Sequence, residues 1–217
     1  FFPDSKVLII VRNQPDLVFS NYRQYVRSGY FRTIDRFVNE MVWNAQQSMW
    51  GRLFFDQVVN ITKEHFEDVL VLPFEQLAYY DEFLEKLNYF FGTTVRPSNT
   101  VVRKSPNDKS IQIIRWLNYL CRRGNGMPLY SILPTYVVGA GRHQYNRLVE
   151  HEPSHTSHKL INKWALRIGE RIPVHTNHHE QFLKEYKHLF EDWFSESNQN
   201  LAKLIDTDLK KFGYIGV

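Results

Sequence analysis

The chain of 217 residues contains little cysteine and no long apolar run. Cys121 is the only cysteine, which excludes an intrachain disulfide and favours a reducing compartment. No apolar run approaches the ~18 residues needed to cross a bilayer, and no signal-peptide pattern opens the sequence. We therefore predict a cytoplasmic location, with a disulfide-free secreted domain as the alternative, and no membrane segment.

Neither sign of charge is in large excess, since the formal net charge is +4. This small excess is compatible with an anionic ligand but does not indicate nucleic acid, so no nucleic acid partner is predicted. Hydrophobic residues make up 43% of the chain and aromatic residues 15%, which excludes a disordered protein. The length favours a single domain, residues 1–217, with a core of ordinary size.

Two short apolar runs predict strands that are buried on both faces. Lys6–Arg12 and Asp68–Pro73 lack the alternation of a half-exposed strand. Pro15 and Asp16 suit the first turn of a helix after the first run. Strands separated by helices predict an α/β fold with a parallel sheet and flanking helices. Two strands do not form a stable sheet alone, so we expect the sheet to be incomplete at the N-terminus.

Helical periodicity follows in most of the remaining chain. Thr33 is predicted to cap a second helix, and a third is predicted from about Met49 to Phe66. Asp81–Phe91 reads as a helix closed by Gly92. Further helices are expected at Asp108–Arg123, with Asp108 as its cap, and near Lys159–Gly169, Glu180–Trp193 and Ser197–Ile205. Residues 1–92 thus form an α/β part, and residues 93–217 a mainly helical and loop part.

Arg12 is predicted to stand at the carboxyl end of the first strand, where open parallel sheets bind ligands. Its guanidinium has the geometry to bind a phosphate bidentately. Ser20 follows eight residues later on the predicted helix, and its hydroxyl is suited to donate to the same phosphate. The residues alone leave a structural alternative open, in which Arg12 forms an ion pair and Ser20 packs against a helix.

Three segments together resemble one enzyme family. PDSKVLIIVRNQPDLVFSNYRQYV, residues 3–26, resembles the segment with which sulfotransferases bind the 3′-phosphate of 3′-phosphoadenosine 5′-phosphosulfate (PAPS). HFEDVLVLPFEQLAYYDEFLEKLNYFFG, residues 65–92, is similar to the family's next strand and helix, and FSESNQNLAKLIDTDLKKFGY, residues 194–214, to its C-terminal pattern. Bacterial and carbohydrate sulfotransferases are the nearest in pattern, because the Arg-Lys-Gly cofactor motif of the cytosolic type is not found.

The resemblance implies a fold, a donor and a reaction. The fold is the P-loop NTPase-like sulfotransferase fold with a helix-rich C-terminal half. The donor is PAPS and the product adenosine 3′,5′-bisphosphate, with no metal expected. The acceptor is a hydroxyl or amine of a carbohydrate or small molecule. Arg12 and Ser20 match the family's cofactor-binding positions. Lys104 and Ser105 are further candidate contacts, with a solvated loop as the alternative.

One departure from the family affects the catalytic residues. The family binds the 5′-phosphosulfate with a loop rich in glycine and basic residues, and its histidine or glutamate base follows that loop. Neither is recognisable here, so both are expected upstream of Phe1 and the catalytic residues are unassigned. Two alternatives stay open: a nucleotide-dependent small-molecule kinase of the same fold class, and a non-catalytic nucleotide-binding or scaffold relative.

Three other features carry weaker functional signals. Glu75 follows the second strand and is expected to orient basic groups or cap the next helix. Eight of the nine histidines fall between His143 and His188, for which a polar surface or solvated loop is preferred over a metal site. Most members of an aromatic set are expected in the core rather than as sugar-stacking platforms: Trp43, Trp50, Tyr79, Tyr80, Trp116, Tyr119, Tyr130, Tyr136 and Trp164.

Overall fold

The computed structural model describes residues 5–27, 30–43, 51, 53–94, 106–120, 164–165, 167–169, 171 and 178–217. The chain divides into two compact units. The first comprises Phe1–Val18, Trp43–Thr100 and Phe182–Val217, and the second comprises Phe19–Val42 and Val101–Gln181.

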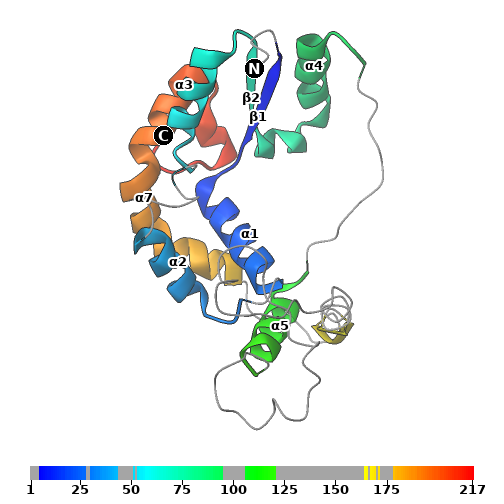
Figure 1. Cartoon of the computed structure of the whole chain (residues 1–217), viewed down its shortest axis with the longest axis vertical. Helices are drawn as coiled ribbons and strands as arrows, with labels where there is room; N and C mark the ends of the chain where they lie inside the picture. The colour runs from blue at the N-terminus through cyan, green and yellow to red at the C-terminus, as the bar shows by residue number, and fades with distance from the viewer. Residues whose placement is uncertain are drawn as a thin grey trace, which may run out of the picture. The chain divides into compact units, whose positions relative to one another are not determined.

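The first unit contains a parallel pair of strands, β1 (Val7–Val11) and β2 (Val69–Pro73), which lie side by side in Figure 1. Val7 is opposite Val69, and Val11 is opposite Pro73. The described part of the chain is mostly helical around this small sheet. A broadly α/β class with parallel strands is therefore confirmed at this coarse level.

The prediction that both strands are buried on both faces is wrong for β1. Leu8 packs against a core cluster formed by Leu72 of β2 with Phe83 and Leu87. Ile10 is nevertheless 42% exposed. Residues two apart in a strand share a face, so Ile10 lies on the same side as Leu8 but outside the apolar cluster. The apolar run predicted the strand correctly and overstated its burial.

Helix α4 (Tyr80–Phe91) supplies Phe83 and Leu87 to this cluster. It ends at Gly92, whose φ of 64° is the left-handed conformation that favours glycine at a helix C-terminus. The predicted helix and its closing glycine are confirmed. The single-turn 3₁₀ helix η2 (Phe74–Ala78) connects β2 to the start of α4.

Two other helices of the first unit differ from their predicted bounds. Helix α3 (Phe55–His65) begins after the predicted start near Met49, because Phe54 is not helical and its ring packs 5.4 Å from that of Phe194. Helix α7 (His178–Ile205) is continuous where two helices were predicted. Phe190, Phe194 and Leu201 are fully or almost fully buried along it, and this apolar stripe runs through the predicted break.

The second unit is built on most of α1 (Gln14–Arg27), with α2 (Ile34–Trp43) and α5 (Asp108–Leu120). The predicted cap of α2 is confirmed, because Thr33 Oγ1 accepts a hydrogen bond from the Arg36 N–H at 3.4 Å. The predicted cap of α5 is wrong. Asn107 Oδ1, and not Asp108, accepts from the Ser110 N–H at 2.8 Å.

The aromatic prediction is wrong for the set members whose burial is described. Trp164 is 64% exposed and Trp116 is 63% exposed, and the set's other exposed members are Tyr79, Tyr80 and Tyr119. Aromatic content alone did not distinguish core from surface, because helical periodicity and not residue type decides which face is covered. Trp50, Tyr130, Tyr136 and the side chain of Trp43 lie outside the described residues.

Two kinds of feature are absent from the described residues, a helix that could span a membrane and a metal-binding cluster. None of their helices combines the length and the apolar character that a bilayer span requires. Within the same ranges, no three His, Cys, Asp or Glu side chains gather in a way that suits a metal ion. Most of the histidine-rich stretch lies outside those ranges, including His143, His151, His155, His158 and His175.

Candidate functional site

Polar residues gather where β1 and β2 end. Arg12 and Asn13 follow β1, and Glu75 lies in η2, which follows β2. Because Val11 is opposite Pro73 in a parallel pair, both segments leave the sheet at the same edge. This carboxyl edge is where parallel α/β sheets bind their ligands.

Glu75 connects three distant parts of the sequence at this edge. Its Oε1 accepts a hydrogen bond from the backbone N–H of Asn13 at 2.9 Å, and its Oε2 accepts from the Tyr214 hydroxyl at 3.4 Å. Asn13 Nδ2 donates to the carbonyl oxygen of Gly213 at 2.8 Å. We call Arg12, Asn13, Glu75 and Tyr214 the Glu75 cluster.

The role found for Glu75 differs from the expected helix cap. The carboxylate accepts a hydrogen bond from the N–H of Asn13, the residue just before α1. It does not cap α4 within the described residues, and Tyr79, at the N-terminus of α4, has no side-chain cap hydrogen bond. Glu75 therefore joins the ends of the two strands. The charge of Arg12 lowers the pKa of Glu75, but no hydrogen bond or ion pair among the described residues joins the two side chains, so the other expectation, that Glu75 orients a basic group, stays a prediction.

Burial controls the protonation of this cluster. It raises the pKa of Glu75, opposed by the hydrogen bond from Asn13 and by the charge of Arg12. Burial also raises the pKa of Tyr214, and the neighbouring Glu75 carboxylate raises it further. Tyr214 consequently remains a neutral hydrogen-bond donor throughout the physiological pH range.

Arg12 is the positively charged member of the cluster, and one of its donors has no partner among the described residues. Its guanidinium lies 4.9 Å from the centroid of the Phe74 ring. Its Nε is buried but forms no hydrogen bond with any described residue. Two buried oxygen atoms nearby in sequence or in η2, Asn13 Oδ1 and Gln76 Oε1, also lack a described partner. No ion pair within 4.0 Å joins Arg12 to a described acid. Buried donors without partners are rare, so this N–H is suited to an anionic ligand.

The other predicted cofactor residues are less completely placed. Ser20 lies half-buried in the second turn of α1 and belongs to the second unit, whereas Arg12 belongs to the first. Their convergence on one phosphate therefore stays a prediction. Lys104 and Ser105 lie outside the described residues, and so their proposed contacts stay predictions too.

Two buried side-chain amides form a hydrogen bond, that of Asn198 and that of Gln14, which directly follows Asn13 in the chain. The sequence did not predict this contact. Gln14 Nε2 donates to Asn198 Oδ1 at 2.6 Å, and Asn198 Nδ2 donates to the carbonyl oxygen of Ile215 at 2.9 Å. Both side chains are completely buried. The available signal was the Ser197-Asn198 pair within an otherwise periodic helix, since polar residues on a buried face require partners.

Comparison with known proteins gave no match: no protein-family model, curated protein or solved structure is similar to this chain.

Proposed function

We propose that this chain is the nucleotide-binding part of a PAPS-dependent sulfotransferase, with Arg12 as the principal contact of the nucleotide 3′-phosphate. The observation that carries the proposal is the buried Nε of Arg12 at the carboxyl edge of the parallel strands, which has no hydrogen-bond partner among the described residues. A guanidinium N–H in that position suits a phosphate oxygen. Ser20, Lys104 and Ser105 are the further proposed contacts.

The Glu75 cluster adds support, because it draws on all three segments that resemble the family. Asn13 comes from the first segment, Glu75 from the second, and Gly213 and Tyr214 from the third. Their side chains and backbone groups share one hydrogen-bond network. Segments that are far apart in sequence but meet around one arginine are consistent with a common task at that arginine.

The cluster also explains how Arg12 would be held ready for an anion. Glu75 fixes the backbone of Asn13, the next residue in the chain, while the Phe74 ring packs on the guanidinium. Arg12 is thus restrained on both its backbone and its side chain. Such restraint reduces the conformational entropy lost when a ligand binds.

The proposed reaction transfers a sulfuryl group from PAPS to an acceptor hydroxyl or amine. The bond between sulfur and the bridging oxygen of the donor breaks as a bond from sulfur to the acceptor oxygen or nitrogen forms. The acceptor's proton passes to a general base, and adenosine 3′,5′-bisphosphate leaves. We assign Arg12 to binding and orienting the donor, and we assign no described residue to the role of base. The proposed fold is the P-loop NTPase-like sulfotransferase fold.

The test is a calorimetric titration with adenosine 3′,5′-bisphosphate and with 5′-AMP, which lacks the 3′-phosphate. We expect the wild-type chain to prefer the bisphosphate and Arg12→Ala to abolish this preference. The loss of one charge-assisted phosphate contact should weaken bisphosphate binding about ten- to a hundredfold. Binding of 5′-AMP should change little, because the contact that is removed involves only the 3′-phosphate.

Lys6→Ala is the matched control, since it removes a positive charge from the opposite end of the same strand. Lys6 Nζ donates to the carbonyl oxygen of Phe90 and lies away from the carboxyl edge. This variant should keep the bisphosphate preference. Equal binding of the two nucleotides by the wild-type chain, or equal losses in Arg12→Ala and Lys6→Ala, would contradict the assignment.

A further inference from the structure

The second unit contains a pocket that the proposed nucleotide site does not use. It has a volume of about 480 Å³ and lies between the start of α2 and one face of α5. Three arginines line it, Arg32, Arg36 and Arg115, and none of the described residues that line it is acidic. We call it the Arg32 pocket. Its lining gives it a positive charge that favours an anion.

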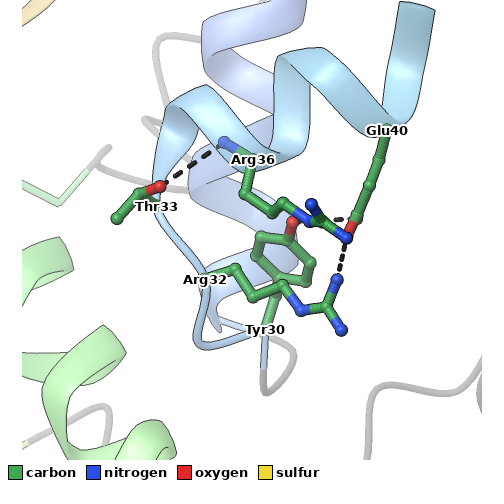
Figure 2. Close-up of polar contacts among 5 residues, drawn as sticks. All are labelled: Tyr30, Arg32, Thr33, Arg36 and Glu40. Atoms are coloured by element: carbon green, nitrogen blue, oxygen red, sulfur yellow. Dashed lines mark hydrogen bonds and ion pairs between the residues drawn. The ribbon is translucent and has the colours of Figure 1, made fainter. Parts of the chain in front are cut away.

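Two of the arginines are held by a shared carboxylate outside the lining. Arg36 Nε donates to Glu40 Oε1 at 3.3 Å, and Arg32 Nη1 contacts the same oxygen. The Tyr30 hydroxyl donates to Glu40 Oε2 at 3.0 Å. Figure 2 shows both guanidinium groups reaching the end of the Glu40 side chain. One carboxylate thus orients two cations, which leaves them with a net positive charge and with unused donors.

The charge near the pocket is not entirely positive. Burial raises the pKa of the Tyr22 hydroxyl, Arg115 opposes this rise, and Asp35, in the first turn of α2, adds to it. The net effect of burial and these charges is a raised pKa for Tyr22. Counting Asp35 and Glu40 against the three arginines still leaves one positive charge, and the positive end of the α2 dipole adds to it.

Aromatic side chains form the rest of the lining. Trp116 and Tyr119 are three residues apart on α5 and therefore share a helix face. Trp116 is 63% exposed, and the Tyr119 ring lies 6.2 Å from that of Phe31. Exposed aromatic faces beside cations suit a ligand that carries a flat or apolar ring.

The two sides of the pocket are fixed to each other by hydrogen bonds within the unit. Asn118 Nδ2, on α5, donates to the carbonyl oxygens of Val26 at 2.7 Å and Tyr30 at 3.1 Å. Tyr30 lies two residues before Arg32, which precedes α2, and Arg36 lies in the first turn of α2. The α5 wall is therefore anchored to the segment that supplies the cations, as a preformed binding site requires.

We propose that the Arg32 pocket binds a tetrahedral oxyanion, a sulfate or a phosphate, that is esterified to a ring. The oxyanion would contact the arginines, and the ring would lie against Trp116 and Tyr119. This binding site goes beyond the proposed nucleotide contact and does not depend on it. The residues that line it all belong to the second unit, whereas Arg12 belongs to the first.

The experiment is a calorimetric titration with phenyl phosphate and with phenyl sulfate. Inorganic phosphate lacks the ring and benzyl alcohol lacks the anion, so each should bind at least about tenfold more weakly than the esters if both parts are recognised. The two esters show whether the pocket prefers phosphate or sulfate. If inorganic phosphate binds as tightly as phenyl phosphate, or if neither ester binds at millimolar concentration, the proposal is wrong.

Two variants locate the binding, each with a matched control in the first unit. Arg36→Ala should weaken both esters about tenfold, and Lys86→Ala, which removes an exposed charge from α4, should not. Trp116→Ala should weaken the esters but not inorganic phosphate, and Tyr89→Ala, which removes a ring that is 90% exposed, should affect none of them. Equal effects in variant and control would overturn the assignment.

The same variants separate this proposal from the nucleotide site. Arg36→Ala should retain the preference for adenosine 3′,5′-bisphosphate over 5′-AMP, and Arg12→Ala should retain phenyl phosphate binding. Circular dichroism of each variant checks that the helices are intact, so that lost binding reflects a lost contact. A bisphosphate preference that depends on Arg36 and not on Arg12 would place the nucleotide in the Arg32 pocket and refute the assignment of the 3′-phosphate to Arg12.

Discussion

The Glu75 cluster and the arginines of the Arg32 pocket are each held by a glutamate that accepts from a tyrosine hydroxyl, but the remaining partners of the two glutamates differ. Glu75 serves two groups from buried residues, since Asn13 is 8% exposed and Tyr214 is 4% exposed. Glu40 serves two guanidinium groups whose side chains are 37% and 62% exposed, those of Arg32 and Arg36. Glu75 therefore accepts hydrogen bonds from buried donors. Glu40 instead orients charged groups at the surface.

The difference predicts unequal structural importance. A buried donor that loses its acceptor has no water to replace it, whereas an exposed guanidinium is hydrated at once. The Glu75 cluster should therefore stabilise the fold, and the Arg32 pocket should be largely dispensable for it. A surface that can lose its charges without unfolding is also the more adaptable place for a binding site.

Replacing Glu75 or Glu40 by alanine should produce the largest difference between the two regions, which is a difference in the free energy of unfolding. Glu75→Ala leaves the Asn13 N–H and the Tyr214 hydroxyl without an acceptor and should lower the free energy of unfolding by about 1–3 kcal/mol. Glu40→Ala removes surface ion pairs and should cost no more than about 1 kcal/mol. Urea denaturation followed by tryptophan fluorescence measures both. Equal losses would show that burial of the partners does not decide the cost.

The pH dependence of stability should show a smaller effect of the buried Glu75 carboxyl group than its replacement by alanine does. Burial raises the pKa of Glu75 above its ordinary value of 4.5, so the folded protein holds this proton more tightly than the unfolded chain does. The resulting contribution to stability is present below pH 4.5 and is lost as the pH rises through the folded-state pKa.

The Glu75→Gln variant has no titrating carboxyl group at this position, so its stability should not decrease in this way as the pH rises. Its free energy of unfolding, relative to the wild type, should therefore increase between about pH 4 and about pH 7. Tyr214→Phe retains the carboxyl group and serves as the control, which should keep the wild-type direction of change. Parallel curves for wild type and Glu75→Gln would contradict a raised pKa at this position.

The smallest expected effect is the loss of a single tyrosine hydroxyl. Tyr214→Phe should cost about 0.5–1.5 kcal/mol, and Tyr30→Phe less, although the Tyr30 bond to Glu40 is the shorter at 3.0 Å against 3.4 Å. The reason is that Tyr214 is almost completely buried and Tyr30 is not. Thermal unfolding of the two variants gives the order directly. A larger loss in Tyr30→Phe would mean that bond length outweighs burial.

The local features of the fold were predictable where nearby residues determine them. Pro15 in the first turn of α1, the Thr33 cap of α2 and the left-handed Gly92 after α4 all depend on backbone groups within a few residues. The parallel pairing of β1 and β2 followed from two apolar runs separated by helices. Element bounds were less accurate, as the late start of α3 shows, because Phe54 takes its place from a contact with Phe194.

The sequence placed Arg12 and Glu75 after the two strands, but it did not predict the residues that surround them. A strand that ends at Arg12 was visible in the sequence, but the partners of Glu75 were not, since Asn13 is 62 residues away and Tyr214 is 139 residues away. The Arg32 pocket gave a partial signal in the Arg36 and Glu40 spacing of one helical turn. Its aromatic wall was misjudged, because Trp116 was expected in the core and is exposed.

The sequence by itself thus determined where the strands and helices form, where several of them start and stop, and that an arginine follows β1. The tertiary structure alone decided which buried groups Glu75 satisfies, why Arg12 retains an unpartnered Nε, and that three arginines share a pocket with exposed rings. The physical reason is distance along the chain. Propensities, caps and turns depend on neighbours within a few residues, whereas burial, pKa and ligand geometry depend on groups that only folding brings together.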